Sequence, residues 1–120
     1  MKLPNATYPM HLNPIHAVQD WCKVRRLVRA VRRGDDVAPI LYEGLPNNGT
    51  LLAGTHRMMA NDILEMLGDR RRIAMVELSN VLDDPECYDL TNDDADALRE
   101  AAADGEYDAI DRIWDRRHDA

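Results

Sequence analysis

Apolar residues recur at helical spacing in three parts of the chain. Between residues 20 and 33 they fall three or four positions apart, so we expect an amphipathic helix that ends at Gly34. A second helix is expected from about His56 to Gly68. Its apolar stripe consists of Met59, Ile63, Met66 and Leu67. Two further helices are expected in the last third of the chain, where Gly105 separates them.

Short apolar runs bounded by turn residues predict strands. Residues 37–42 and 50–53 flank a turn sequence in which Asn48-Gly49 is a strong hairpin signal, so we expect these two runs to pair. Other strands are expected at 71–78 and 8–12. The whole pattern predicts an α/β (α+β) fold, a small mixed sheet with flanking helices and a C-terminal acidic helical pair.

The acidic segment has an apolar stripe of its own. Thr91 opens a Thr-x-x-Asp capping pattern, which predicts a helix start. The apolar positions of the two expected helices are Leu98, Tyr107, Ile110, Ile113 and Trp114. A disordered acidic tail would lack such a stripe, so we expect this segment to dock on the rest of the chain and cover part of the basic helix 20–33. Trp21 and Trp114 are expected to anchor the core.

Charge divides the chain into two unequal parts. The net charge of the 120 residues is -7, and 45% of them are hydrophobic, which suits one globular domain. Residues 1–80 carry 11 Lys or Arg and 8 Asp or Glu, whereas residues 81–120 carry 4 and 14. We therefore expect a mildly basic core at 1–82 and an acidic helical extension at 83–120, which is either an interaction surface or a solvated face.

Several classes of protein are not expected. No apolar run approaches the roughly 20 residues of a membrane span, and the first residues lack the apolar core of a signal peptide, so we expect a cytoplasmic protein without a membrane partner. Cys22 and Cys87 are too few for a disulfide framework or a zinc site. The four histidines show no metal-ligand spacing, so no metal site is expected; they are His11, His16, His56 and His118.

The seam between the strand 50–53 and the next helix is the best candidate for chemistry. A strand that turns directly into a helix presents unpaired backbone N–H groups and the positive end of the helix dipole, which suit phosphate. Gly54 lets the backbone approach a ligand closely, and Thr55 can cap the helix or donate its hydroxyl. Arg57 adds a planar, permanently charged guanidinium that suits phosphate oxygens. His56 offers a hydrogen bond or a proton. The alternative is an ordinary helix entry with Arg57 facing solvent.

The order of these features resembles the ParB/sulfiredoxin superfamily. Pro39-Ile40 corresponds to its Pro-Ile strand, a hairpin follows, and GTHR at residues 54–57 corresponds to its Gly-x-x-Arg box. The resemblance covers roughly residues 15–82. It implies a ParB/sulfiredoxin-like core in which Gly54, Thr55, His56 and Arg57 hold the phosphates of a nucleotide, near a loop at residues 34–36.

Two departures from this family change the expected activity. Sulfiredoxins carry a catalytic cysteine in this turn, where the present chain has Thr55, so sulfinic acid reduction is not expected. ParB proteins continue into DNA-binding and dimerisation domains, so partition-site binding is not expected either. Related serine kinases use the scaffold for phosphoryl transfer with a nucleoside triphosphate and Mg²⁺, and related proteins have been called nucleases. The catalytic candidates are Glu43, Asp36 and His56. Asp35, Asp36 and Asp62 are acids that could reach the turn, with a solvated face as the alternative role for each.

Three functions therefore stay open. The first is binding of a nucleotide or another phosphate ligand, with or without phosphoryl transfer; no cofactor at all is the alternative. The second is binding of nucleic acid by the basic face of helix 20–33, which otherwise is the solvated side of that helix, paired with the acidic extension. This face comprises Lys23, Arg25, Arg26, Arg29, Arg32 and Arg33. The third is a protein-binding or regulatory module that uses the acidic helices, in the manner of a phage or mobile-element accessory protein.

Overall fold

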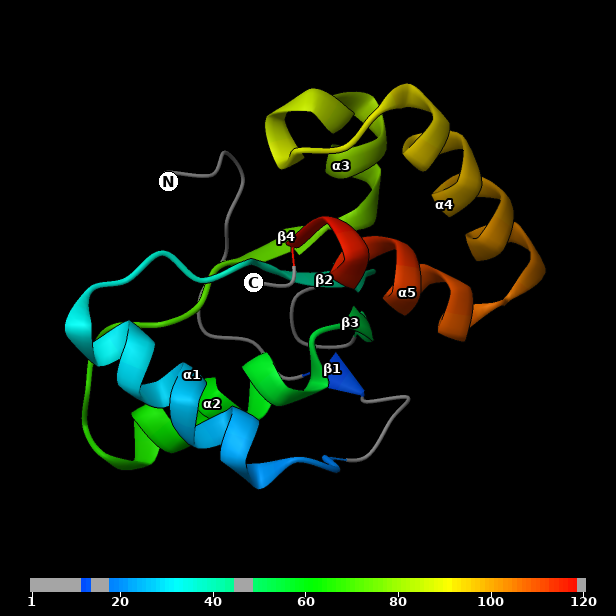
Figure 1. Ribbon diagram of the computed structural model, residues 1–120. Helices are drawn as coiled ribbons and strands as arrows, with labels where there is room; N and C mark the ends of the chain where they lie inside the picture. The colour runs from blue at the N-terminus through cyan, green and yellow to red at the C-terminus, as the bar shows by residue number, and fades with distance from the viewer. Residues whose placement is uncertain (1–11, 14–17, 45–48, 119–120) are drawn as a thin grey trace.

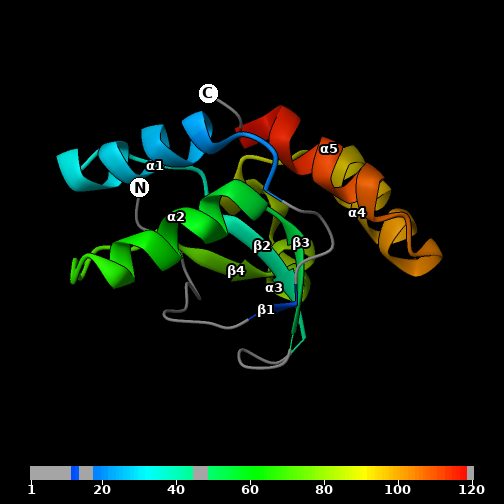
Figure 2. The ribbon, with the colours of Figure 1, turned by 90° about the horizontal axis from the view of Figure 1, so that it is seen from below.

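A mixed sheet lies between two layers of helices (Figures 1 and 2). The computed structural model describes residues 12–13, 18–44 and 49–118. Its strands are β1 (Leu12–Asn13), β2 (Ile40–Glu43), β3 (Gly49–Ala53) and β4 (Met75–Glu77). Its helices are α1 (Trp21–Arg33), α2 (Thr55–Met66), α3 (Leu78–Asp83), the 3-10 helix η1 (Pro85–Tyr88), α4 (Asn92–Asp104) and α5 (Tyr107–His118). The expected α+β class is confirmed.

The sheet has the strand order β1-β3-β2-β4. β2 and β3 form the expected antiparallel hairpin, while β1 and β4 pair in parallel with β3 and β2. The turn at 45–48 and the first four residues of the expected strand 8–12 lie outside the described residues. β4 is shorter than the predicted strand 71–78. The reason is that the backbone N–H groups of Arg71 and Ile73 donate to side chains, those of Asp69 and Asn61, instead of to a neighbouring strand.

Consecutive strand residues face opposite helical layers. Ile40, Leu51 and Met75 pack with α1 and α2 on one side of the sheet. Their neighbours Leu41, Leu52 and Val76 pack with the C-terminal helices on the other side. Because both faces of the sheet are covered, its strands are runs of apolar residues without a polar face.

The acidic extension therefore occupies the sheet face opposite α1 and α2 (Figure 2). It meets the basic helix at Lys23, which lines a cavity with Asp108, Asp111 and Asp115, but it leaves the arginines of that helix exposed and so covers less of it than we expected. The physical reason is that burying an apolar side chain contributes about 1.5–3 kcal/mol, whereas an exposed ion pair contributes less than about 1 kcal/mol. The apolar stripe thus determines where the extension docks, and the attraction between the acidic and basic halves does not.

Helix α1 ends where expected, before Gly34, and begins one residue later than predicted, because Asp20 is its N-cap. The Asp20 carboxylate caps its start by accepting the Lys23 N–H at 3.1 Å, and Gly34 ends it in the left-handed region with φ +84°. Its buried stripe is Val24, Val28 and Val31. Trp21 is 51% exposed, so the prediction that it anchors the core is wrong. It is the first residue of the helix and lies beyond the end of that stripe, on the outer side.

Helix α2 starts one residue earlier than predicted and buries a different face. Ala60 and Leu64 are fully buried, whereas Met66 and Leu67, which we expected in the apolar stripe, are 84% and 55% exposed. The buried face also includes Asn61, whose side-chain amide donates to the Ile73 carbonyl at 3.0 Å and accepts the Ile73 N–H at 2.7 Å. This paired amide fixes α2 to the segment that leads into β4.

The C-terminal layer contains two short elements that were not predicted, α3 and η1. Helix α3 follows β4 without a loop, because Glu77 is the last residue of the strand and its carboxylate caps the helix by accepting the Ser79 N–H at 2.8 Å. Hydrophobic periodicity alone did not separate this six-residue helix from the strand before it.

Helices α4 and α5 are held together by Asp94. Its carboxylate completes the expected capping box with Thr91 and also pairs with Arg116 at 3.3 Å and Arg117 at 2.8 Å. Burial alone would raise the pKa of Asp94, but the hydrogen bonds from Thr91 and Arg117 outweigh burial and hold that pKa below its usual value. Asp94 therefore stays charged and joins the start of α4 to the end of α5.

Candidate functional site

Gly54 forms the turn between β3 and α2. Its φ is +106°, and a Cβ atom added there would lie 3.3 Å from Ile40 Cγ1. Its carbonyl accepts the Met58 N–H at 2.8 Å, which is the first backbone bond of α2. No side chain among the described residues caps this helix, and the N-cap is Gly54, so of the two roles expected for Thr55 the helix cap is excluded. The sharp turn thus leads the chain directly from the sheet into the positive end of a helix dipole.

Arg57, in the first turn of α2, is only 4% exposed, so the alternative in which it faces solvent is wrong. Its Nη1 lies 3.2 Å from Asp115 Oδ1 on α5. Its Nε is buried and has no hydrogen-bond partner in the part of the chain that the structure describes. A buried guanidinium with an unsatisfied N–H is costly, since each such group carries a desolvation penalty of about 1–3 kcal/mol.

A cavity of about 290 Å³ opens at this turn. It lies where the starts of α1 and α2 meet one side of α5 (Figure 2). The lining residues are Gln19, Lys23, Gly54, Thr55, His56, Arg57, Asp108, Asp111 and Asp115. All four residues of the predicted Gly-x-x-Arg turn therefore line one cavity.

The three aspartates of this cavity were not predicted. Asp108, Asp111 and Asp115 lie three and four positions apart on α5, so they share one side of that helix. This spacing was visible in the sequence as an acidic stripe beside the apolar stripe of Ile110 and Trp114. What the sequence did not reveal is that this side of α5 meets Gly54 and Arg57, which are more than 50 residues away in the chain.

His56 joins α2 to the start of α1. Its Nε2 accepts the backbone N–H of Asp20 at 3.1 Å and faces that of Gln19 at 3.4 Å. Burial, with the nearby Lys23 ammonium, lowers the pKa of His56 below 6.5. A histidine that accepts at Nε2 is neutral, so in this structure His56 serves as an anchor for α1 and has no proton at Nε2 to give.

Lowering the pH is expected to destabilise the protein through His56. Because its pKa is lower in the folded state, the unfolded state takes up the proton first, and stability falls as the pH drops below about 6.5. Urea unfolding at pH 7.5 and 5.5 measures this loss. His56→Gln, which keeps a hydrogen-bond acceptor but does not titrate, should lose less stability between these pH values than the wild type. An equal loss of stability in both proteins would show that His56 is not the group responsible for this pH dependence.

The other catalytic candidates lie away from the cavity. Glu43 is exposed at the end of β2, opposite Thr50, while Gly54 follows the other end of β3. Asp36 and the rest of the loop 34–36 line a second cavity of about 440 Å³, so the prediction that this loop lies near the Gly54 turn is wrong. Asp35 pairs with Arg33 at 2.8 Å. None of these acids is therefore placed to act at the turn.

The second cavity is lined on one side by basic groups. Arg71, Arg72, Arg117 and His118 line it. The carboxylate of Asp69 accepts two hydrogen bonds from the Arg71 guanidinium, which lower its pKa to about 2. The Arg117 guanidinium pairs with Asp94, and both ring nitrogens of His118 face backbone carbonyls of Trp114 and Tyr88. These groups already have protein partners, so we place the candidate site at the first cavity.

The basic face of α1 is divided by the structure. Lys23 lines the first cavity, together with the aspartates of α5. The arginines at positions 25, 26, 29, 32 and 33 are exposed on the outer side of the helix. The cavity thus combines cationic groups and the start of α2 with three carboxylates. Among the described residues, no group of three or more His, Cys, Asp or Glu side chains is placed to hold a metal ion by itself.

No family model, no curated protein and no solved structure matches this chain. The resemblance to the ParB/sulfiredoxin superfamily therefore stays a prediction. Among the described residues, every helix is too short or too polar to cross a membrane. The function is consequently argued from the geometry and charge of the cavity.

Proposed function

We propose that the protein binds the phosphate groups of a nucleoside triphosphate, carried with Mg²⁺, in the cavity at the Gly54 turn. The observation that carries this proposal is the buried Arg57 guanidinium, whose Nε has no partner among the described residues. A phosphate oxygen is a favoured acceptor for the N–H groups of a guanidinium, so a ligand that reaches Nε would supply the missing partner. The resemblance of residues 15–82 to the ParB/sulfiredoxin superfamily implies the same class of ligand at the same turn.

The phosphate would lie against the start of α2. Its first N–H groups have no acceptor within the helix, and the helix dipole adds about half a positive charge there. Lys23 and Arg57 supply two full charges on adjoining walls of the cavity. A volume of about 290 Å³ is at the lower end of the range for ligand pockets, so it suits the phosphate groups, with the nucleoside lying outside.

The carboxylates of α5 explain why a cation belongs to the ligand. A bare phosphate would be repelled by Asp108, Asp111 and Asp115. Mg²⁺ is usually held by phosphate oxygens, waters and only one or two carboxylates, so it does not need a complete protein site. A phosphate–Mg²⁺ complex therefore matches both sides of the cavity, with its anionic part toward α2 and its cationic part toward α5.

Titration calorimetry with nucleoside triphosphates and Mg²⁺ tests the proposal. Arg57→Ala removes a charge-assisted contact and should weaken binding by about 1.5–3 kcal/mol, roughly 10- to 150-fold. Arg29→Ala is the matched control, because Arg29 is exposed on the outer side of α1 and does not line the cavity. Since Arg57 is buried, Arg57→Lys provides a second variant that keeps volume and charge but loses the fork. Equal affinities in the wild type and both Arg57 variants would overturn the proposal.

The role of Mg²⁺ is tested separately with Asp111→Asn. This change removes one negative charge from the side of α5 that lines the cavity, so binding should weaken with Mg²⁺ present and strengthen with EDTA. Asp104→Asn, at an exposed acid near the end of α4, is the control. At 100 times its Kd, the ligand should stabilise the wild type by roughly 2.7 kcal/mol, which raises Tm by several degrees. If no nucleotide changes Tm, a protein-binding role of the acidic helices becomes the leading alternative.

A further inference from the structure

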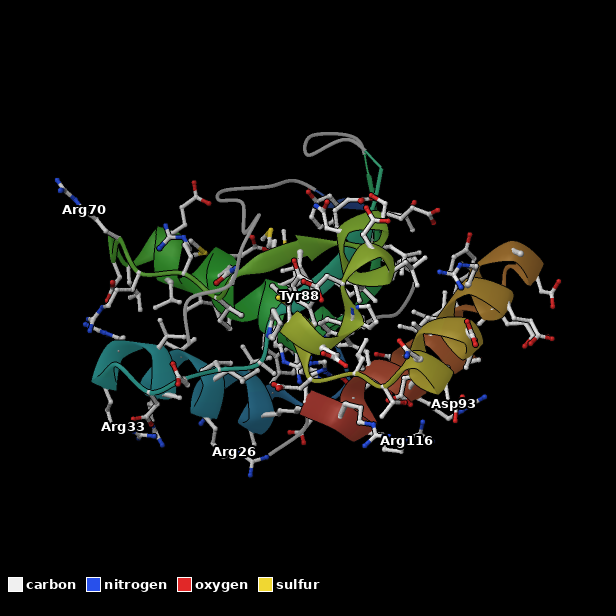
Figure 3. The ribbon with its side chains drawn as sticks, turned by 90° about the horizontal axis from the view of Figure 1, so that it is seen from above. Arg26, Arg33, Arg70, Tyr88, Asp93 and Arg116 are labelled. Carbon is white, nitrogen blue, oxygen red and sulfur yellow. The ribbon has the colours of Figure 1, made fainter. Side chains whose placement is uncertain are left out.

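The outer side of α1 presents a row of exposed arginines that the cavity does not use. These are Arg25, Arg26, Arg29, Arg32 and Arg33. Arg32 lies 3.5 Å from Asp69 and Arg33 lies 2.8 Å from Asp35. None of the ion pairs between described residues involves Arg25, Arg26 or Arg29. Figure 3 shows Arg26 and Arg33 pointing away from the body of the protein.

Among the described residues, only Arg32 and Arg33 of this row have an acidic partner. The acidic extension, with 4 Lys or Arg against 14 Asp or Glu in residues 81–120, packs its apolar stripe on the opposite face of the sheet, and three of its acids line the cavity that Lys23 of α1 also lines. In Figure 3, the labelled Arg26 and Arg33 lie along α1, apart from the labelled Asp93 at the start of α4. Although the net charge of the molecule is -7, the outer side of α1 is locally cationic. This side of the protein can therefore attract a polyanion.

An exposed aromatic side chain stands at the start of the same row. Trp21 is 51% exposed, and Arg25 follows it one helical turn later on the same side of α1. Arg29 lies a further turn along. A surface tryptophan beside a line of arginines matches the combination that single-stranded nucleic acids require, an aromatic face for a base and positive charges for the backbone.

We propose that this surface, Trp21 with the outer arginines of α1, binds single-stranded nucleic acid. The phosphates follow the arginines along a helix of 13 residues, which is about 20 Å long, and a base stacks on Trp21. The surface is separate from the cavity, because the pocket at Gly54 is lined by Gln19 and Lys23 of this region and not by Trp21 or the arginines. Its test therefore does not depend on the nucleotide site.

Fluorescence anisotropy with a labelled 12-nucleotide single strand and the matching duplex tests this surface between 25 and 200 mM NaCl. The wild type should bind the single strand, with an affinity that falls steeply with salt. The double variant Arg25→Gln with Arg29→Gln should weaken binding at least tenfold at 50 mM NaCl. It should also reduce the slope of log K against log salt by about 1.4, since each lost phosphate contact removes about 0.7. The control, Arg99→Gln with Arg112→Gln, makes the same change in net charge on exposed residues of α4 and α5 and should do neither.

Trp21→Ala separates stacking from charge. It should weaken single-strand binding by roughly tenfold and leave the salt slope unchanged. Arg57→Ala should leave this binding unchanged. The proposal is overturned if the wild type does not bind at 25 mM NaCl, if the control double variant loses as much affinity, or if the duplex binds as tightly with no effect of Trp21→Ala. Salt-dependent self-association that the α1 variant abolishes, without oligonucleotide binding, would assign the surface to a second copy of the chain and also overturn it.

Discussion

Replacing Trp114 with alanine is expected to lower the free energy of unfolding by about 3–5 kcal/mol, the largest effect of any single change that we predict. The indole is fully buried in the cluster that joins α5 to the sheet. Its Nε1 donates to the Pro39 carbonyl at 2.8 Å, and its ring lies 4.0 Å from that of His118. Alanine would leave a cavity and a buried carbonyl without its donor. Urea unfolding followed by circular dichroism measures the loss.

The other tryptophan is a matched control. Trp21→Ala removes the same number of atoms from a side chain that is 51% exposed, so it should change stability far less than Trp114→Ala. Trp114→Phe keeps most of the apolar volume but loses the bond to Pro39, so its loss should fall between the two. Similar losses at the two tryptophans would contradict the assignment of Trp114 as the anchor of α5. Because α5 carries Asp115, Trp114→Ala should also weaken any ligand bound in the cavity.

Gly54→Ala is expected to destabilise the protein by about 2–5 kcal/mol. One part of this cost, about 1–2 kcal/mol, arises because φ at Gly54 is +106°, in a region that L side chains rarely adopt. The other part arises because the new Cβ would lie 3.3 Å from Ile40 Cγ1 in a packed core, where added atoms cost about 1–3 kcal/mol. The same urea unfolding measurement gives this loss.

Gly105 provides the control for this second prediction. Its φ is +68°, and a Cβ atom added there would meet nothing within 4 Å. Gly105→Ala should therefore cost only the backbone part, and the difference between the two variants measures crowding against Ile40. If Gly54→Ala were no more destabilising than Gly105→Ala, the turn would not be as tightly packed as the structure indicates.

Much of the secondary structure was predictable because its signals act within a few residues. Asp20 and Gly34 mark the two ends of α1, and Thr91 with Asp94 marks the start of α4. Each of these contacts joins groups no more than a few positions apart, so the sequence alone places them. The boundary between β4 and α3 was missed, because Glu77 is both the last residue of β4 and the N-cap of α3, and because Ile73, before the strand, bonds to the distant Asn61.

The candidate site was predictable only on one of its sides. A glycine, a threonine and an arginine at the seam of a strand and a helix are local features, and all of them line the cavity. The opposite side comes from α5, and its aspartates reach the turn only because Trp114 and Ile110 fill the far face of the sheet. The burial of apolar side chains determines where α5 packs, and the position of its aspartates follows from that packing.

The sequence by itself determined the α+β class, the β2–β3 hairpin and most helix ends of this protein, since backbone hydrogen bonds and caps depend on neighbouring residues. Only the tertiary structure decided which tryptophan is buried, why Arg57 is enclosed and where the acidic helices lie. Two consecutive apolar residues such as Ile40 and Leu41 require a helical layer on each side of the sheet, but they do not specify which helix supplies it. Which helix covers which face of the sheet depends on how the apolar stripes of all the helices pack together. In the resulting arrangement the arginines of α1 are exposed to solvent and lie outside the layer formed by the acidic helices.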